Sequence, residues 1–274
     1  MRQSQVLEFG SSIAVLLAAG LCVGAGHAIE RWSNRSAPVA GSTWFNLGCF
    51  VPASILQSVA LPLVAGTTVL AVKALGGGLI VLPDHGWGLP LGLVIYTLAM
   101  DLAEYVYHRA QHRFPILWAM HSLHHSDAEF NVSTTIRHFW ADPLIKACTV
   151  YLLVGLSFRS SPAIVEIYGV LAYYNYVAHM DVRLGFGRWS WLLNSPRYHR
   201  LHHSSRPGDE NANFAALLPI WDVLTGAYRA PRPGDYPPTG LTDEPGPSSV
   251  VGAIVWPLRA NLGVGAPKRR AAAT

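Results

Sequence analysis

Long apolar stretches separated by short polar ones dominate the first half of this chain of 274 residues. Residues 9–29 are apolar over about the length that a helix needs to cross a bilayer. Residues 36–72 then contain no charged side chain at all, which is too long a run for one simple crossing. Because Pro52 and Pro62 interrupt this run, we predict an interfacial entry followed by a spanning helix over about 53–75.

A glycine triplet at residues 76–78 ends this run, and residues 79–87 are expected to form a turn. Residues 88–112 predict the next helix, whose first half is apolar and whose second half carries the polar side chains. Asp101, Glu104, His108 and His112 are three or four residues apart, so they share one stripe of that helix. Their position at one end of the helix places them near one face of a membrane.

Pro115 predicts the end of this helix. His121, His124 and His125 then follow at positions i, i+3 and i+4, which is typical of one face of a second, short helix. The same spacing returns far downstream in three further histidines. These are His199, His202 and His203.

Two apolar runs, residues 143–158 and 162–180, lie between these histidine groups. Each is short for a spanning helix, and we expect a tilted or re-entrant hairpin whose ends lie on the same side of a membrane. This hairpin returns His179 to the side where the earlier histidines lie. Arginines are frequent in the segments on that side, whereas residues 76–87 contain neither Arg nor Lys, so the positive-inside bias predicts that the histidines face the cytoplasm.

Composition agrees with a membrane protein. The chain is 51% hydrophobic and 13% charged, against about 25% charged in ordinary soluble domains. The net charge is +4, and no run is basic enough for a nucleic-acid surface. Cys22, Cys49 and Cys148 lie far apart in apolar runs without a CxxC pair, so neither a disulfide framework nor a zinc site is predicted.

The sequence therefore predicts an all-α fold, namely an integral membrane bundle of about four to five membrane helices with a cytoplasmic cap of short helices that carry the histidines. We divide it into N-terminal membrane helices (1–100), a histidine-bearing region that includes the hairpin 143–180 (101–228), and a Pro/Gly-rich tail (229–274) with an interfacial segment over 249–263.

The histidine motifs indicate metal binding. Neutral imidazole is a good ligand for first-row transition metals, and eight histidines with His179 as a ninth exceed the four ligands of one tetrahedral ion. Two metal ions fit that number better. We expect carboxylates to balance their charge and to orient the imidazoles through the free ring N–H groups. Asp101 and Glu104 are placed for this role, and Asp222 is a further candidate.

These motifs resemble the three histidine boxes of the fatty acid hydroxylase / sterol desaturase superfamily. The resemblance covers about residues 101–228, and the flanking residues agree with it. The residues that carry it are His108-x3-His112, His121-x2-His124-His125, His199-x2-His202-His203, Tyr107-His108-Arg109, Ser195-Pro196-Arg197 and Trp221-Asp222-x2-Thr225-Gly226.

The resemblance implies an integral membrane enzyme with two iron ions, which uses O2 and external electrons to hydroxylate or desaturate a C–H bond of a lipid. A sterol, a fatty acyl chain or a related lipid are the substrates it implies. The chain shows no fused cytochrome b5-like segment, so a separate ferredoxin- or cytochrome b5-like electron donor is expected. The partners implied are this donor, the lipid and the membrane, and no nucleic acid.

The resemblance also implies that His179 is a metal ligand, and it adds His138 as a further candidate. His138 stands in the order Arg-His-Phe, whereas relatives often read Arg-x-His-Pro. Relatives with ten histidines carry another one four residues after the position of His179, where this chain has Arg183. One iron is therefore expected to have fewer histidines, with water or a carboxylate in addition.

The alternative function is a histidine-rich membrane metal-binding protein or a metal transporter. A transporter carries its polar ligands near the middle of the bilayer, whereas these histidines lie at a helix end and in short cytoplasmic helices. A zinc hydrolase needs a catalytic Glu in a motif such as H-E-x-x-H, and the chain has none. A bis-histidine haem site leaves both H-x-x-H-H motifs unexplained.

Overall fold

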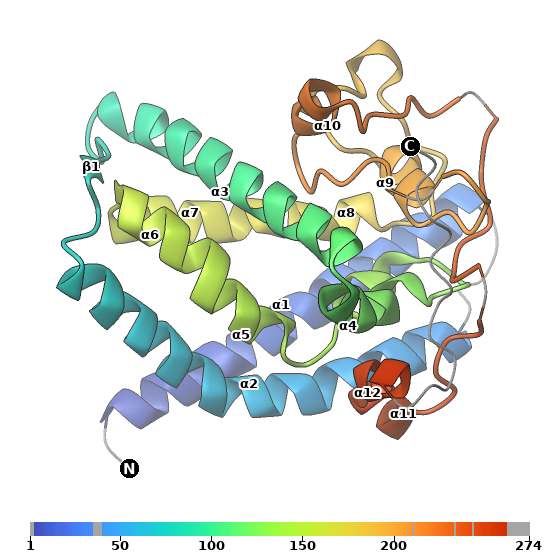
Figure 1. Cartoon of the computed structure of the whole chain (residues 1–274), viewed down its shortest axis with the longest axis horizontal. Helices are drawn as coiled ribbons and strands as arrows, with labels where there is room; N and C mark the ends of the chain where they lie inside the picture. Colours follow the sequence, from blue (N-terminus) through green and yellow to red (C-terminus); the bar gives the residue numbers. More distant parts are fainter. Residues whose placement is uncertain (1–2, 35–39, 210, 233, 243, 262–274) are drawn as a thin grey trace.

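Three long helices build the first half of the molecule in the computed structural model, which describes residues 3–34, 40–209, 211–232, 234–242 and 244–261 (Figure 1). They are α1 (Gln3–Asn34), α2 (Ala40–Ala74) and α3 (Gly88–Arg113). Nearly all of α2 and the whole of α3 are long and apolar enough to cross a membrane. The predicted helical class is confirmed, with two candidate membrane helices in the described part of the chain.

α2 runs through both of its prolines, so the predicted division of this segment is wrong. Pro52 and Pro62 each remove one backbone hydrogen bond, but an apolar surrounding offers the backbone no better partner than the helix. With a rise of about 1.5 Å per residue, α2 is longer than the roughly 30 Å core of a bilayer. Its first turns bury Ser42 and Asn46 against the carboxylate of Asp127, so this end of α2 packs on protein.

The predicted break after α3 is confirmed. Phe114 has an extended backbone (φ −100°, ψ 126°), and α4 (Pro115–His125) begins directly after it. Proline suits the first position of a helix, because its fixed φ is already helical and its missing N–H would have no partner there. The sharp turn allows α4 to pack on the end of α3 (Figure 1).

The predicted hairpin is built from short helical pieces that pack on α3 through Met100, Tyr107, Val150 and Val154. Its two arms meet at residues 158–161, as expected. The first arm contains α5, a π-helical turn η2 and α6, and the second contains α7 and α8. Their bounds are α5 (Asp142–Lys146), η2 (Ala147–Tyr151), α6 (Leu152–Ser157), α7 (Pro162–Ala172) and α8 (Tyr174–Ala178).

A short parallel sheet joins the two turns at the end of the molecule remote from α4 and α9 (Figure 1). β1 (Ile80–Val81) pairs with β2 (Phe158–Arg159), with Ile80 opposite Phe158 and Val81 opposite Arg159. Strands of two residues leave no periodic pattern in a sequence, which explains why this sheet was not predicted.

Short helices gather with α4 at the other end (Figure 1). They are η1 (Val132–Ile136), η3 (Gly187–Trp189), α9 (Pro196–His202), α10 (Ile220–Thr225), α11 (Val250–Ile254) and α12 (Trp256–Asn261). In α12, the indole N–H of Trp256 donates to Ser122 Oγ of α4 at 2.9 Å. α11 and α12 occupy most of the predicted interfacial segment, and residues 262–274 of the tail lie outside the described residues.

The end of α1 is fixed to the same region by a buried carboxylate. Glu30 Oε1 accepts hydrogen bonds from the backbone N–H groups of Val132 and Asp181, each at 2.7 Å. A buried carboxylate is stable only when such donors surround it. The contact therefore holds η1 and the segment that follows α8 against α1, and this segment contains His179.

Candidate metal centre

Nine of the twelve histidines converge where α3, α4, α8 and α9 meet. They include every histidine of the three predicted boxes together with His179. Four helices supply them: His108 and His112 lie on α3, His121, His124 and His125 on α4, His179 directly after α8, and His199, His202 and His203 on or directly after α9.

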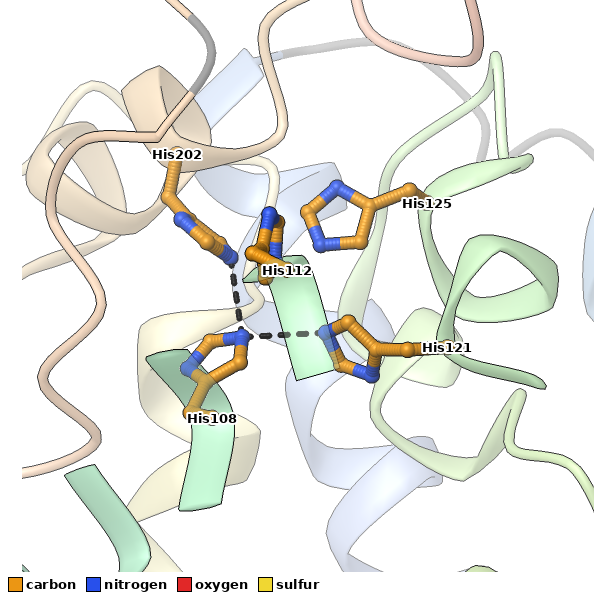
Figure 2. A group of neighbouring side chains, drawn as sticks. All are labelled: His108, His112, His121, His125 and His202. Atoms are coloured by element: carbon orange, nitrogen blue, oxygen red, sulfur yellow. Dashed lines mark hydrogen bonds between the residues drawn. The ribbon is translucent and has the colours of Figure 1, made fainter. Parts of the chain in front are cut away.

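The nine side chains form two separate groups, in each of which the potential ligand atoms lie within 4.8 Å of one another. The five-histidine group contains His108, His112, His121, His125 and His202 (Figure 2). The four-histidine group contains His124, His179, His199 and His203. The two groups are in contact, because the rings of His125 and His203 are stacked with 4.3 Å between their centres.

The division follows from the H-x-x-H-H motif on α4 and α9 together with the way these two helices face each other. Residues at i and i+4 share a helix face, whereas i+3 points to an adjacent position. On α4 the first and third histidines of the motif join the five-histidine group and the middle one, His124, joins the other. On α9 the assignment is reversed, and only the middle histidine, His202, joins the five-histidine group. α3 then adds two histidines to one group, and α8 adds one to the other.

Hydrogen bonds fix the tautomers of two histidines in the five-histidine group. His108 Nδ1 lies 2.6 Å from the carbonyl oxygen of Phe214, and His202 Nδ1 lies 2.8 Å from that of Ala212. A carbonyl can only accept, so both Nδ1 atoms carry the proton, and each neutral ring has its lone pair on Nε2. Burial lowers the pKa of His202 to about 4, so this ring is neutral at pH 7.

These two lone pairs face each other, because the Nε2 atoms of His108 and His202 are 3.1 Å apart (Figure 2). His121 Nε2 lies 2.9 Å from the same His108 atom. Lone pairs repel at this distance unless a cation lies between them. Two nitrogen ligands on one metal are about 3.0 Å apart when each bond is about 2.1 Å and the angle is 90°, so the spacing fits a metal site.

The four-histidine group follows the same rule. His179 Nδ1 lies 2.7 Å from the carbonyl oxygen of Asn175, which leaves the lone pair on Nε2. That atom lies 3.2 Å from His124 Nε2 and 3.0 Å from His199 Nε2. The carbonyl of Asn175 therefore orients His179 toward two other imidazoles.

Several buried ring nitrogens in both groups have no hydrogen-bond partner in the described part of the protein. Leaving a buried polar atom unpaired costs about 1–3 kcal/mol, and a bound metal ion would remove this cost at each ring nitrogen that serves as its ligand. The donor set is entirely imidazole, which suits Fe, Cu, Ni or Zn. The atoms are His112 Nε2, His121 Nδ1, His124 Nδ1, His125 Nε2, His199 Nδ1, His203 Nδ1 and His203 Nε2.

Aromatic side chains cover the two groups. The rings of Trp118 and Phe214 both lie 5.0 Å from the ring of His112. Phe130 lies 4.9 Å from the ring of His203 and stacks on that of His179 at 5.5 Å. These contacts lower the local polarity and keep bulk water from the imidazoles.

His138 and Arg183, the two positions left open by the sequence, both lie outside the groups. The ring of His138 stacks on that of His124, with 4.4 Å between their centres and an angle of 11°. The guanidinium of Arg183 lies 4.4 Å from the ring centre of Tyr236. The second group therefore contains four histidines, one fewer than the first.

The expectation that Asp101 and Glu104 contact the imidazoles is wrong. Asp101 accepts hydrogen bonds from the backbone of Leu217 (3.0 Å) and Leu218 (3.1 Å) and from the indole of Trp221 (2.8 Å). The negative charge of Glu104 interacts electrostatically with Lys146. Asp101 precedes His108 by seven residues, which is about 10 Å of helix rise, too far for a direct hydrogen bond.

Asp222 also acts on the backbone. It is fully buried and accepts hydrogen bonds from the N–H groups of Phe214 (3.0 Å) and Ala215 (2.9 Å) and from the hydroxyl of Tyr198. Burial raises its pKa, and these hydrogen bonds oppose the rise. The acceptors that orient His108 and His202 are thus backbone carbonyls, which no residue type reveals. The only signal in the sequence was the Trp221-Asp222 pair nearby.

Comparison with known proteins identifies relatives of this region. Residues 93–227 match the fatty acid hydroxylase family model. The chain is 31% identical over 142 residues to alkylglycerol monooxygenase of Xenopus tropicalis. The aligned residues make up 52% of this chain and 31% of that protein. It is 29% identical over 160 residues to ornithine lipid hydroxylase OlsE of Rhizobium tropici. This alignment makes up 58% of the chain and 48% of that protein.

Alkylglycerol monooxygenase of Homo sapiens is 30% identical over 144 residues, which covers 53% of the chain and 32% of that protein. The chain therefore matches less than half of the length of each of these relatives. No solved structure matches it. Because the matched region holds the nine converging histidines and both of their groups, the family model and the geometry describe the same site: residues 93–227 of the chain are similar to the fatty acid hydroxylase family.

Proposed function

We propose that this protein is a membrane-bound di-iron oxygenase that hydroxylates or desaturates a C–H bond of a lipid, using O2 and electrons from a separate donor. The observation that carries the proposal is the pair of adjacent all-histidine groups with ring lone pairs directed at each other. The relatives support it, since they are named as an alkylglycerol monooxygenase and an ornithine lipid hydroxylase.

In this proposal the five-histidine group holds one iron and the four-histidine group holds the other. Neutral imidazoles suit divalent iron. Bound iron would supply activation of O2 and the one-electron steps needed to break an unactivated C–H bond. Hydroxylation then balances as R–H + O2 + 2e⁻ + 2H⁺ → R–OH + H2O, and desaturation releases a second water in place of the alcohol.

The protein side chains contribute orientation and exclusion of water. The carbonyls of Phe214, Ala212 and Asn175 hold the protons on Nδ1 of three histidines, which keeps their Nε2 lone pairs available. Trp118 and Phe214 shield the five-histidine group. A dry site protects a strong oxidant from side reactions with solvent. The electron donor is proposed to be a ferredoxin- or cytochrome b5-like protein.

A lipid substrate is supported by the position of the site. His108 and His112 lie in the last turns of α3, a candidate membrane helix, so an acyl chain between the helices could reach them from the bilayer. We further propose a multi-pass arrangement of about four to five membrane helices with the histidines facing the cytoplasm. The end of α1 and the start of α2 both contact the histidine-bearing region, which supports this arrangement.

The test is to purify the protein in detergent, load it anaerobically with Fe(II), and measure iron per chain and O2 consumption with a reduced ferredoxin system. We expect two irons per chain. His202→Ala and His124→Ala remove one ligand from each group, and each should lose one iron and all lipid oxidation. His85→Ala is the control, because this histidine is exposed and pairs only with Asp84 among the described contacts.

Lipid extracts from cells with and without the protein, compared by mass spectrometry, would identify the substrate by a gain of one oxygen or a loss of two hydrogens. A single bound zinc and no O2 consumption would overturn the proposal. Metal uptake into vesicles without lipid oxidation would favour a transporter instead.

A further inference from the structure

A short loop that carries no predicted ligand holds two histidines in place. In this loop, residues 212–215, the carbonyls of Ala212 and Phe214 accept the Nδ1 protons of His202 and His108. We call it the carbonyl loop. Those two imidazoles come from α9 and α3, which are separated by 94 positions in the chain, so the loop sets the relative orientation of two ligands from distant elements.

The backbone of the carbonyl loop has an unusual conformation between its two carbonyls. Asn213 has φ of 59°, in the left-handed region, where asparagine is one of the few tolerated residues besides glycine. Its buried side chain accepts from the N–H of Arg229 at 2.7 Å and donates to the carbonyl of Arg229 at 3.0 Å. A conformation of this kind persists only when its surroundings hold it.

Two buried carboxylates hold the loop and the segment that follows it. Asp222 accepts the N–H groups of Phe214 and Ala215. Asp101 accepts those of Leu217 and Leu218 from the side of α3. Both side chains are almost completely buried. The five residues 214–218 therefore contain four backbone N–H groups bound by carboxylates. The carbonyl of Phe214, at the start of this stretch, and that of Ala212, two residues before it, accept from the histidines.

We propose that Asp222 and Asp101 are positioning residues for the five-histidine group alone, acting through the carbonyl loop, and that without them this group loses its metal while the four-histidine group keeps its own. The inference rests on the proposed two-metal site. Its selectivity follows from the acceptors, since His179 in the four-histidine group is oriented by Asn175 of α8, which lies outside the loop.

The experiment uses the full-length protein in detergent, loaded with Co(II), whose visible absorption changes with the number and kind of its ligands. Metal per chain is measured after competition with a chelator. In Asp222→Asn, the amide nitrogen places donors against backbone N–H groups and breaks one of the two contacts. We expect one Co(II) to stay bound as tightly as in the unaltered protein, and the affinity for the other to fall by about 10–100-fold.

Tyr198→Phe is the matched control, because it removes the hydroxyl contact to Asp222 and leaves both hydrogen bonds between Asp222 and the loop backbone in place. It should retain two metals. Asp127→Asn tests general destabilisation, since it alters a carboxylate that is also buried but contacts Ser42, Asn46 and Thr134. It should lower the melting temperature without selective loss from the five-histidine group.

Double variants identify which group is emptied. Asp222→Asn combined with His202→Ala should bind as much metal as His202→Ala alone, whereas Asp222→Asn combined with His124→Ala should lose both metals. If Asp222→Asn does not fold, Asp101→Asn provides the same test from the other end of the segment, with a smaller expected loss.

Two results would overturn the inference. One is that Asp222→Asn and Asp101→Asn bind two Co(II) with spectra equal to those of Tyr198→Phe. The other is that both metals weaken equally, in step with the melting temperature. Fewer than two Co(II) per chain in the unaltered protein would instead contradict the proposed function, so the two failures are distinguishable.

Discussion

His124 and His125 are neighbours in the chain but belong to different groups, with ring centres 5.6 Å apart. The sequence predicted all nine converging histidines from three spaced motifs and a resemblance. It could not predict their division, because that depends on how α4 and α9 face each other. The roles expected of Asp101 and Glu104 failed for a related reason. A stripe on one helix says nothing about a loop more than 110 residues later that packs against it.

Protonation of the buried imidazoles is expected to destabilise the metal-free protein in acid. Burial lowers the pKa of His202 from 6.5 to about 4, so between these values the unfolded chain binds a proton that the folded chain does not. Stability therefore falls as the pH decreases from 6.5 to 4. A shift of this size corresponds to about 3 kcal/mol for this residue alone.

The melting temperature of the metal-free protein in detergent, measured from pH 7 to pH 4, checks this expectation. His202→Gln cannot take up the proton and should show a shallower decrease. A melting temperature that is constant or rises toward pH 4 would contradict it.

α1, α3, α4 and the hairpin followed from the apolar runs and prolines of the sequence, because signals such as the break at Pro115 have a local cause. The continuity of α2 and the pairing of β1 with β2 did not follow. The first depends on the surroundings of two prolines, and the second joins two turns that are 78 positions apart. Neither feature could therefore be predicted from the local sequence pattern.

The turn before α3 contains Pro83 and packs closely against Gly92 of that helix. A Cβ at Gly92 would overlap the carbonyl oxygen of Pro83 and lie 3.0 Å from Ile164 Cδ1. Because backbone cannot move as a side chain does, we expect Gly92→Ala to destabilise the protein by about 1–3 kcal/mol. Gly169 on α7 has nothing within 4 Å of such a Cβ, and Gly169→Ala should be neutral or stabilising, since alanine favours helix.

Thermal unfolding of the two variants in the same detergent gives the comparison, and metal content should remain at the unaltered value in Gly169→Ala. Equal melting temperatures for both variants would show that the contact between α3 and the turn before it does not contribute to the stability of the protein.

At the scale of the whole molecule, the proposed multi-pass orientation predicts which surfaces face which compartment. The turn with β1 and the cap with α9 lie at opposite ends (Figure 1). In a variant without the three native cysteines, His85→Cys should react with a membrane-impermeant thiol reagent added outside cells. Arg232→Cys, in the cap, should react only after the membrane is opened.

Both side chains are exposed in the structure, so a lack of labelling has a topological meaning. Labelling of Arg232→Cys in intact cells would invert the proposed orientation. Labelling of both positions from one side would contradict a crossing between them.

Because both histidine groups take ligands from α4 and from the segment 199–203, the order of synthesis decides when the metal centre can form. A chain emerging from a ribosome has completed α3 and α4, with five of the nine histidines, long before α9 exists. Both groups need histidines from residues 199–203, so neither group can be completed before this segment is synthesised. Assembly of the centre is therefore expected to follow the folding of α9 onto α4 and to depend on the metal supply at that later time.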